Sequence, residues 1–248
     1  MKVYNMLSHT NISVNALFTH ADFTGTAHGL IHGSFMREIY AAVKTNTSRL
    51  LTVQFSSYQS AVVQIGDRGS TTTILRPGNA QRVDNVQVEL EDRSVKITTA
   101  DWEVRARSRV KRSILHATKC ADGRCIIDIF VKPRFDTANA TVAPHGLMGQ
   151  SFDGDDIGLI GATDQYRGRE FTTSAMGEGA IEGSAADYEM PDKFSADFKF
   201  SRFGKVFAAP RNVTAFSGVN IKTQRPLVEA VARNDMDGAW GVAHKGDG

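Results

Sequence analysis

Hydrophobic and polar residues alternate with a period of two along most of the first 135 residues. The alternation covers residues 3–7, 13–18, 50–55, 61–65, 73–75, 85–90, 94–98 and 102–107. β-Branched side chains dominate these segments, and Gly, Asp, Asn and Pro separate them about every eight to twelve residues. Because no long helical segment intervenes, the pattern predicts an all-β protein with an antiparallel β-sandwich.

The pattern changes at Pro144. Residues 144–190 are rich in Gly, Asp and small side chains, which predicts a loop-rich C-terminal third. Strand-like alternation returns over residues 195–203, with Phe198 and Phe200 on one face. We therefore expect a β domain over residues 1–203. Residues 204–248 would form an extended tail that includes a short helix and docks as an arm on a neighbour.

Three stretches, in the same order, carry a resemblance to a known superfamily. They are Tyr4-Asn-Met-Leu-Ser with Ile12-Ser-Val-Asn-Ala-Leu-Phe, then Pro144-His-Gly-Leu-Met-Gly-Gln-Ser-Phe, then residues 183–198. Together they resemble von Willebrand factor type D domains and the plant root-cap (late-embryogenesis-related) proteins. The resemblance implies a non-catalytic extracellular module. Met148 and Phe198 stand where those relatives often have cysteine, so apolar burial must replace their disulfides.

The second of these stretches has a physical explanation of its own. Gly146 and Gly149 suit backbone positions that need a positive φ or a close approach between strands. Leu147 and Met148 would then pack inward. This interpretation assigns Gly146, Leu147 and Gly149 to a structural corner of the sandwich.

Composition narrows the class of protein. The chain has 248 residues, is 41% hydrophobic and 23% charged, and carries 29 Lys+Arg against 27 Asp+Glu. That hydrophobic fraction is typical of a folded globular protein. No apolar run reaches the roughly 18 residues of a membrane helix, so we expect no transmembrane segment. The small net charge gives no global attraction to nucleic acid.

Cysteines and glycosylation motifs bear on the cellular compartment. Cys120 and Cys125 flank a turn, so they could form a local disulfide or remain two reduced thiols. Four N-glycosylation motifs begin at Asn11, Asn46, Asn139 and Asn212. The N-terminus has no apolar core typical of a signal peptide. We favour a secreted protein, here a mature piece of a longer chain, over an intracellular one.

An acidic loop follows the Gly146–Gly149 corner. Asp153, Asp155 and Asp156 could wrap Ca²⁺, which takes six to eight oxygen ligands. Some type D domains have a calcium-binding loop at the corresponding point, so the resemblance implies that this loop binds calcium. The alternative is a solvated acidic turn without metal, and the sequence leaves both open. No other cofactor is predicted.

Basic and histidine residues provide two further candidates. Arg105, Arg107, Arg109 and Lys111 alternate, so in a strand they share one face and could bind a polyanion or a partner protein. The alternative is a charged edge that blocks strand pairing. His28 and His32 would lie about 13 Å apart along a strand, too far for one metal ion unless the strand bends at Gly29. A third ligand such as His20 cannot be argued from sequence, so ordinary polar positions are favoured.

No catalytic motif is evident for nucleophilic catalysis, phosphate binding or zinc-dependent hydrolysis. The sequence therefore favours a non-catalytic extracellular module that contacts proteins or glycans, alone or as part of a larger assembly. One alternative is a carbohydrate-active protein, a lectin or glycoside hydrolase that uses the acidic loops, although Trp102 and Trp240 offer few platforms for sugar stacking. Another is an intracellular scaffold subunit.

Overall fold

The computed structural model describes most of the chain up to Lys205. The described residues are 1–25, 29–57, 61–65, 71–112, 114, 124–137, 140–154 and 181–205. One compact unit comprises Met1–Gly154 and Ala186–Pro210, and a second comprises Asp155–Ala185 and Arg211–Gly248. Nearly all described residues belong to the first unit, which holds the β-sheets. Asp155, Asp156 and nearly all of the predicted tail lie outside the described residues.

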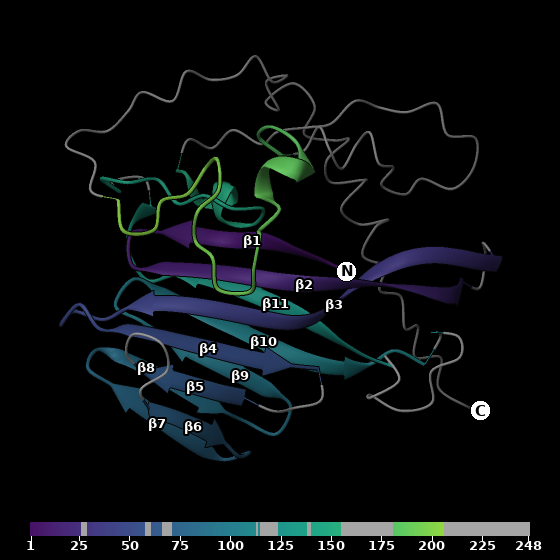
Figure 1. The fold of residues 1–248 in the computed structure, drawn as a ribbon, viewed down its shortest axis with the longest axis horizontal. Helices are drawn as coiled ribbons and strands as arrows, with labels where there is room; N and C mark the ends of the chain where they lie inside the picture. Colours follow the sequence, from purple (N-terminus) through teal and green to yellow (C-terminus); the bar gives the residue numbers. More distant parts are fainter. Residues whose placement is uncertain are drawn as a thin grey trace, which may run out of the picture. The chain divides into compact units, whose positions relative to one another are not determined.

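The first unit is an antiparallel β-sandwich, as the alternation predicted (Figure 1). Its first sheet has the strand order β1-β2-β3-β4-β5-β6 and its second the order β11-β10-β9-β8-β7, so each sheet is a meander. The first sheet consists of β1 (Lys2–His9), β2 (Ile12–Gly25), β3 (Gly29–Lys44), β4 (Leu50–Ser56), β5 (Ala61–Ile65) and β6 (Thr71–Leu75). The second consists of β7 (Asn79–Val83), β8 (Val86–Leu90), β9 (Ser94–Thr98), β10 (Trp102–Val110) and β11 (Cys125–Pro133). Two short 3-10 helices follow, η2 (Gly149–Phe152) and η3 (Ala185–Tyr188).

The core lies between the sheets because alternate side chains of each strand point inward. Buried Leu, Ile and Val from both sheets surround Phe55 and Trp102. His9 belongs to this interior: its ring stacks on Phe135 with centroids 5.2 Å apart, and its Nε2 lies 3.2 Å from the Val142 carbonyl oxygen. Burial lowers the pKa of His9, against a smaller opposing effect of Asp101. The core therefore favours the neutral imidazole.

Most predicted strands are present, but β3 and β7 were not predicted. In β3 the period of two is broken, because the register against β2 shifts by one residue at Arg37. From Ile39 to Val43 both faces of β3 are buried, so polar residues no longer mark the outer face. The sequence therefore lacks the alternation by which the other strands were recognised.

The open edge of β1 is covered by residues from the corner stretch. Ser8 and His145 exchange two backbone hydrogen bonds, of 2.6 and 2.8 Å. The Leu147 N–H donates to the Asn5 carbonyl oxygen at 3.1 Å. The side chains of Leu147 and Met148 pack against the core. This pairing satisfies an edge that would otherwise be open to another strand.

The position of Gly146 has no space for a side chain. Its φ is +105°, and a Cβ at this position would lie 2.6 Å from Asn5 Oδ1 and 2.7 Å from the backbone N of Leu7. Backbone and buried polar atoms cannot yield as a flexible side chain does. At Gly149 a Cβ would lie 3.1 Å from Leu7 Cδ1, a tight but less severe contact. The close approach of residues 145–149 to β1 thus depends first on Gly146.

Residues 186–205, the covering segment, lie over the outer face of β1–β3. Asn15 Nδ2 donates to the carbonyl oxygens of Lys193 and Ser195 at 3.0 and 2.7 Å. The Tyr40 ring is fully buried and meets Phe194 edge to face, with centroids 5.5 Å apart. Burial, reinforced by the Glu38 carboxylate, raises the pKa of Tyr40. The outer face of this sheet is therefore a second, partly polar packing layer.

The prediction of a strand over residues 195–203 is wrong. This part of the covering segment forms turns: the Ser201 N–H donates to the Phe198 carbonyl oxygen at 3.0 Å. Phe198 and Phe200 do share contacts, since both rings meet Tyr188, with centroids 6.0 and 5.3 Å away. Aromatic spacing of two therefore arises here from turn geometry without a strand.

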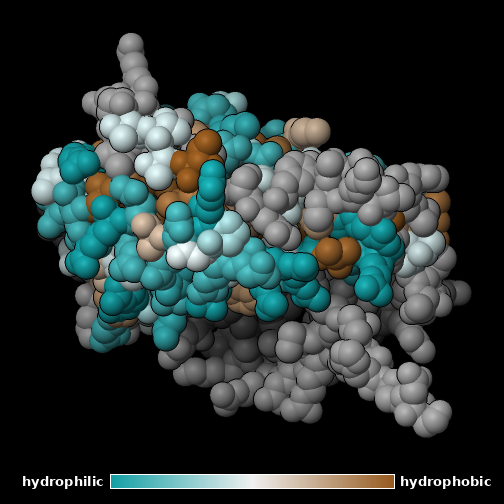
Figure 2. All heavy atoms as spheres, turned by 90° about the horizontal axis from the view of Figure 1, so that it is seen from below, coloured by the Kyte–Doolittle hydropathy of each residue, from teal (hydrophilic) through white to brown (hydrophobic). Residues whose placement is uncertain are grey.

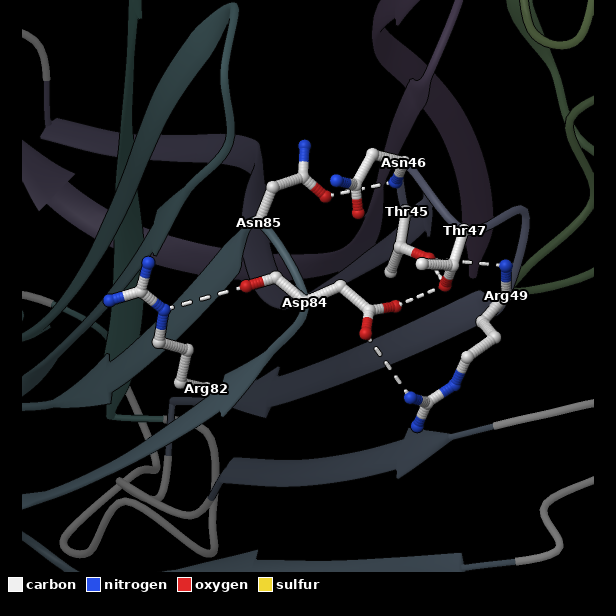
Figure 3. A network of polar contacts seen from close by, with 7 residues as sticks. All are labelled: Thr45, Asn46, Thr47, Arg49, Arg82, Asp84 and Asn85. Carbon is white, nitrogen blue, oxygen red and sulfur yellow. Dashed lines mark hydrogen bonds and ion pairs between the residues drawn. The ribbon is translucent and has the colours of Figure 1, made fainter.

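A polar network joins the turn between β3 and β4 to the turn between β7 and β8 (Figure 3). Asp84 accepts hydrogen bonds from Thr47 Oγ1 at 2.5 Å and Arg49 Nη1 at 3.3 Å, and Asn85 Oδ1 accepts from the Asn46 N–H at 2.9 Å. Hydrogen bonds from threonine side chains lower the pKa of Asp84, with a smaller contribution from Arg49. The network links the two sheets at one end of the sandwich.

The short strands β6 and β7 are edge strands of the first and second sheet, and they expose mainly polar side chains. Figure 2 views this side, where hydrophilic groups cover most of the described surface and hydrophobic ones are scattered. Ile74 is an exception, with 70% of its surface exposed. Short polar edge strands discourage pairing with other chains. Within the described residues, no helix has the length and apolar character needed to cross a bilayer.

Candidate functional site

A basic depression of about 660 Å³ lies on the second sheet, at the end of β10. We call it the arginine depression. Its lining consists of Arg93, Arg107, Ser108, Arg109, Val110, Arg112, Asp128 and Phe130. Four arginines thus line one open surface together with a single acidic residue, Asp128.

Strand register explains how these arginines come together. Arg107 and Arg109 lie two residues apart on β10, so they share one face, and Arg107 stands opposite Ser94 of β9. Arg93 immediately precedes Ser94, and its carbonyl oxygen accepts a hydrogen bond from the Ser108 N–H at 2.7 Å. Arg112 follows the end of β10. The turn before β9 therefore lies beside the end of β10.

Carboxylates neighbour two of the lining arginines: Arg93 Nε lies 3.7 Å from Oδ2 of Asp92, which is outside the lining, and Arg109 pairs with Asp128. Arg109 Nη1 donates to Asp128 Oδ2 at 2.9 Å, and Asp128 is largely shielded, with 13% of its side chain exposed. Arg107 and Arg112 are exposed to solvent. Two apolar groups stand beside them: Phe130 is 56% exposed and Val110 is 46% exposed. The surface therefore combines cations with an accessible aromatic ring.

The predicted row of four cations is only partly assembled here. Arg107 and Arg109 line the depression, whereas Arg105 lies outside the lining and its Nη2 is 3.8 Å from Glu91 Oε1. Lys111 follows the end of β10, and its ammonium group lies 5.7 Å from the Phe23 ring centroid. The expectation that Lys111 continues the row is wrong, because the strand ends one residue earlier.

Sequence reasoning did not select Arg93 and Arg112 as members of this site. Arg93 lies in a turn, and only the β9–β10 register places it beside Arg107. Arg112 is three residues from Arg109, a spacing that in a continuous strand predicts opposite faces. Recognising that β10 ends at Val110 would have provided the missing signal.

The depression is chemically suited to anions. Guanidinium groups form paired hydrogen bonds with sulfate, carboxylate and phosphate oxygens. An exposed aromatic ring offers an apolar platform for the C–H face of a sugar ring. Since Asp128 is the sole carboxylate in the described lining and is held by Arg109, the depression lacks the carboxylate pair of a glycosidase.

A separate group of possible metal ligands lies on β2 and β3. Asp22 Oδ1 is 2.7 Å from His32 Nδ1 and 3.5 Å from His20 Nε2. The two imidazole rings are nearly parallel, with centroids 6.2 Å apart. One ligand atom from each residue lies within 4.8 Å of the other two. The sequence did not predict that His20 and His32 approach the same aspartate, and His28 lies outside the described residues.

Other predicted sites are described only in part. Asp153 follows η2, but its proposed calcium partners Asp155 and Asp156 lie outside the described residues. Cys120 also lies outside the described residues. Its predicted partner Cys125 is described and is buried at the start of β11. The calcium loop and the disulfide therefore stay predictions.

Two of the four glycosylation motifs lie on described parts of the chain. Asn11 is exposed in the turn between β1 and β2, and Asn46 is exposed in the turn between β3 and β4. Asn139 and Asn212 are outside the described residues. Both described asparagines are thus accessible to modification.

Residues from three stretches that are far apart in the sequence, 4–18, 144–152 and 186–198, contact one another at β1 and β2. Asn5 and Asn15, from the first stretch, are joined by a 2.9 Å hydrogen bond from Asn5 Nδ2 to Asn15 Oδ1. Gly146 of the second stretch packs over Asn5, and the Lys193 carbonyl of the third accepts from Asn15. The motif residues therefore form one structural unit within the first compact unit.

Comparison with known proteins identifies no relative: no family model, curated protein or solved structure matches the chain.

Proposed function

We propose that this protein is a non-catalytic recognition module of the extracellular space that binds acidic polysaccharides through the arginine depression. The observation that carries the proposal is the grouping of four arginines and the exposed Phe130 ring around one open surface. A sulfated or carboxylated polysaccharide alternates anionic groups with apolar ring faces, which is the pattern this lining complements. An acidic protein surface is the alternative ligand, because arginine and aromatic side chains are also enriched at protein interfaces.

Two further observations support the extracellular part of the proposal. The described glycosylation motifs present Asn11 and Asn46 in exposed turns. In addition, the three stretches that resemble type D and root-cap proteins are in mutual contact. Modules of that kind work by presenting a rigid surface, and here the sandwich would hold the arginine depression in a fixed shape.

The proposal is tested by affinity for heparin, used as a sulfated probe. Replacing Arg107 and Arg112 with serine should weaken binding at least about tenfold, because charge-assisted hydrogen bonds contribute about 1.5–3 kcal/mol each. The slope of log affinity against log salt should also become shallower by about two, as two cation contacts are lost. Isothermal titration at several salt concentrations measures both quantities.

A matched control removes the same charge elsewhere. Lys44 and Arg76 are exposed and lie outside the arginine depression, so replacing both with serine should change heparin affinity by less than about twofold. Equal losses in the two double variants would mean that only net charge matters, which contradicts a defined site. Heparin that stays full length after prolonged incubation would support recognition, and shortened chains would contradict a non-catalytic role.

A further inference from the structure

The hairpin of β2 and β3 extends beyond the neighbouring strands. Among the described residues, β1 pairs with β2 only as far as Phe18, and β4 pairs with β3 only as far as Glu38. Beyond these points β2 and β3 continue as a ribbon, visible in Figure 1 where they run past the other strands. Phe23 and Phe35 pack on one side of this ribbon against a small cluster with Ile114 and Ile126. We call this part of the hairpin the β2–β3 ribbon.

Register places three possible ligands on the opposite face of the ribbon. Asp22 of β2 stands directly across from His32 of β3, and His20 precedes Asp22 by two residues on the same strand. Side chains two residues apart share a face, and directly opposed residues do as well. All three side chains are open to solvent, with 69%, 40% and 66% exposed for His20, Asp22 and His32.

We propose that His20, Asp22 and His32 form a binding site for a Zn²⁺ ion. The ligands of a tetrahedral zinc ion, about 2.0–2.1 Å from the metal, lie roughly 3.3 Å from one another. Two of the three separations, from Asp22 Oδ1 to His32 Nδ1 at 2.7 Å and to His20 Nε2 at 3.5 Å, lie near that value, and all three ligand atoms lie within 4.8 Å of one another. Small rotations of exposed side chains would complete the geometry.

The ligand set selects the class of metal. Two imidazoles with one carboxylate suit Zn²⁺ and its borderline neighbours such as Co²⁺, whereas Ca²⁺ and Mg²⁺ require mostly oxygen ligands. His32 Nδ1 lies within hydrogen-bond distance of Asp22 Oδ1, and His20 Nε2 approaches the same oxygen. A cation at this point would attract both ring nitrogens and the carboxylate oxygen.

A bound ion would cross-link β2 to β3 in the part of the hairpin where, among the described residues, an isolated bridge from Phe23 to Ile114 is the only pairing with a third segment. Two-stranded ribbons are marginal on their own, so the metal would stabilise the ribbon conformation. Three protein ligands leave at least one coordination position for water or for a group from another molecule. This site is separate from the arginine depression and does not depend on the proposed polysaccharide binding.

The test is a titration of the full chain, free of any polyhistidine tag, with Zn²⁺ alone. We expect one ion per chain by calorimetry and a rise in melting temperature. Bound Co²⁺ should give the visible absorption of a low-coordinate site. Changing His20, Asp22 or His32 singly to Asn should weaken Zn²⁺ binding by more than about tenfold, since even outer partners of metal ligands contribute that much.

Ser34 provides a matched control. It is exposed and stands opposite His20 on the same face of the ribbon, but it supplies no imidazole or carboxylate. Ser34→Ala should bind Zn²⁺ as the unchanged protein does. Unchanged affinity in the His20, Asp22 and His32 variants would overturn the proposal, since the ion would then bind elsewhere, and so would absence of binding by the unchanged chain. Circular dichroism without metal checks that each variant remains folded.

Discussion

The outer faces of the two sheets differ in what covers them. On the first sheet, Asn15 and Tyr40 are buried beneath the covering segment, and Asn15 holds two of its carbonyl oxygens. On the second sheet, Arg107, Arg109 and Phe130 are exposed around an open depression. Both faces are polar, but the polar groups of the first make internal hydrogen bonds while many of the second face solvent. The first face is therefore an internal packing surface, and the second carries side chains that are accessible to solvent.

The largest effect on this comparison should come from Gly146→Ala. The added Cβ would meet backbone and buried polar atoms of β1 within 2.7 Å, and the residue would keep a φ of +105°. Backbone strain and overpacking together should lower the free energy of unfolding by about 4 kcal/mol. Urea denaturation measures this loss.

Gly78→Ala is the control for the Gly146 variant. Gly78 has a similar φ of +85°, but nothing lies within 4 Å of its added Cβ. Only the backbone cost remains, so we expect a loss of about 1 kcal/mol. Equal losses at the two glycines would show that the close approach of residues 145–149 to β1 contributes nothing.

Asn15→Ala should have the next largest effect. The change removes two hydrogen bonds to the carbonyl oxygens of Lys193 and Ser195 and the one from Asn5. Because these groups are at least partly buried, the free energy of unfolding should fall by about 2–3 kcal/mol. Amide hydrogen exchange in the covering segment should accelerate, while exchange in β9 and β10 should change little.

Asn85→Ala is the matched change at a less buried position. Its Oδ1 accepts one hydrogen bond, from the Asn46 N–H. The expected loss is about 0.5–1 kcal/mol, without faster exchange in the covering segment. If amide exchange in the covering segment were equally slow in both asparagine variants, the hydrogen bonds of Asn15 would not be what holds the covering segment on the sheet.

The smallest predicted effect concerns pH and the core histidine His9. Burial lowers its pKa below 6.5, so the unfolded chain binds a proton at a pH where the folded chain does not. The stabilising contribution of neutral His9 is therefore complete above the unfolded pKa and declines as pH falls through it. Replacing His9 with Phe, which can retain the stacking on Phe135, should flatten the fall in unfolding free energy between about pH 7.5 and 5.5.

The His9 prediction has a direct check. Titration of the His9 ring followed by NMR should give a pKa below the ordinary histidine value. If the Phe variant loses stability on acidification as steeply as the unchanged protein, His9 does not contribute to that loss.

Sequence patterning was informative where one side of a strand faces the core. It predicted β4, β8, β9 and β10 because their inner and outer residues alternate, and it predicted β1 from alternating residue types although residues 5–9 are buried on both faces. It did not predict β3, where the bulge at Arg37 and burial on both faces remove the alternation. Residues 195–203 led to the opposite error, because Phe198 and Phe200 are spaced as in a strand but lie in turns.

The candidate sites were harder to predict because they depend on strand register. Arg107 and Arg109 were found from their spacing, but Arg93 joins them only through the pairing of β9 with β10. Likewise, the contact between His32 and Asp22 can be predicted only when the register of the β2–β3 hairpin is known. Contacts across strands depend on which residues are paired, and one chain's periodicity does not give that pairing.

The most direct test of the proposed binding face is amide chemical-shift mapping during titration with a sulfated oligosaccharide. We predict saturable shifts at Arg93, Arg107, Arg109 and Phe130, with little change at Asn15 beneath the covering segment. Shifts that centre on the first sheet, or that never saturate, would contradict the assignment of the arginine depression as the binding site.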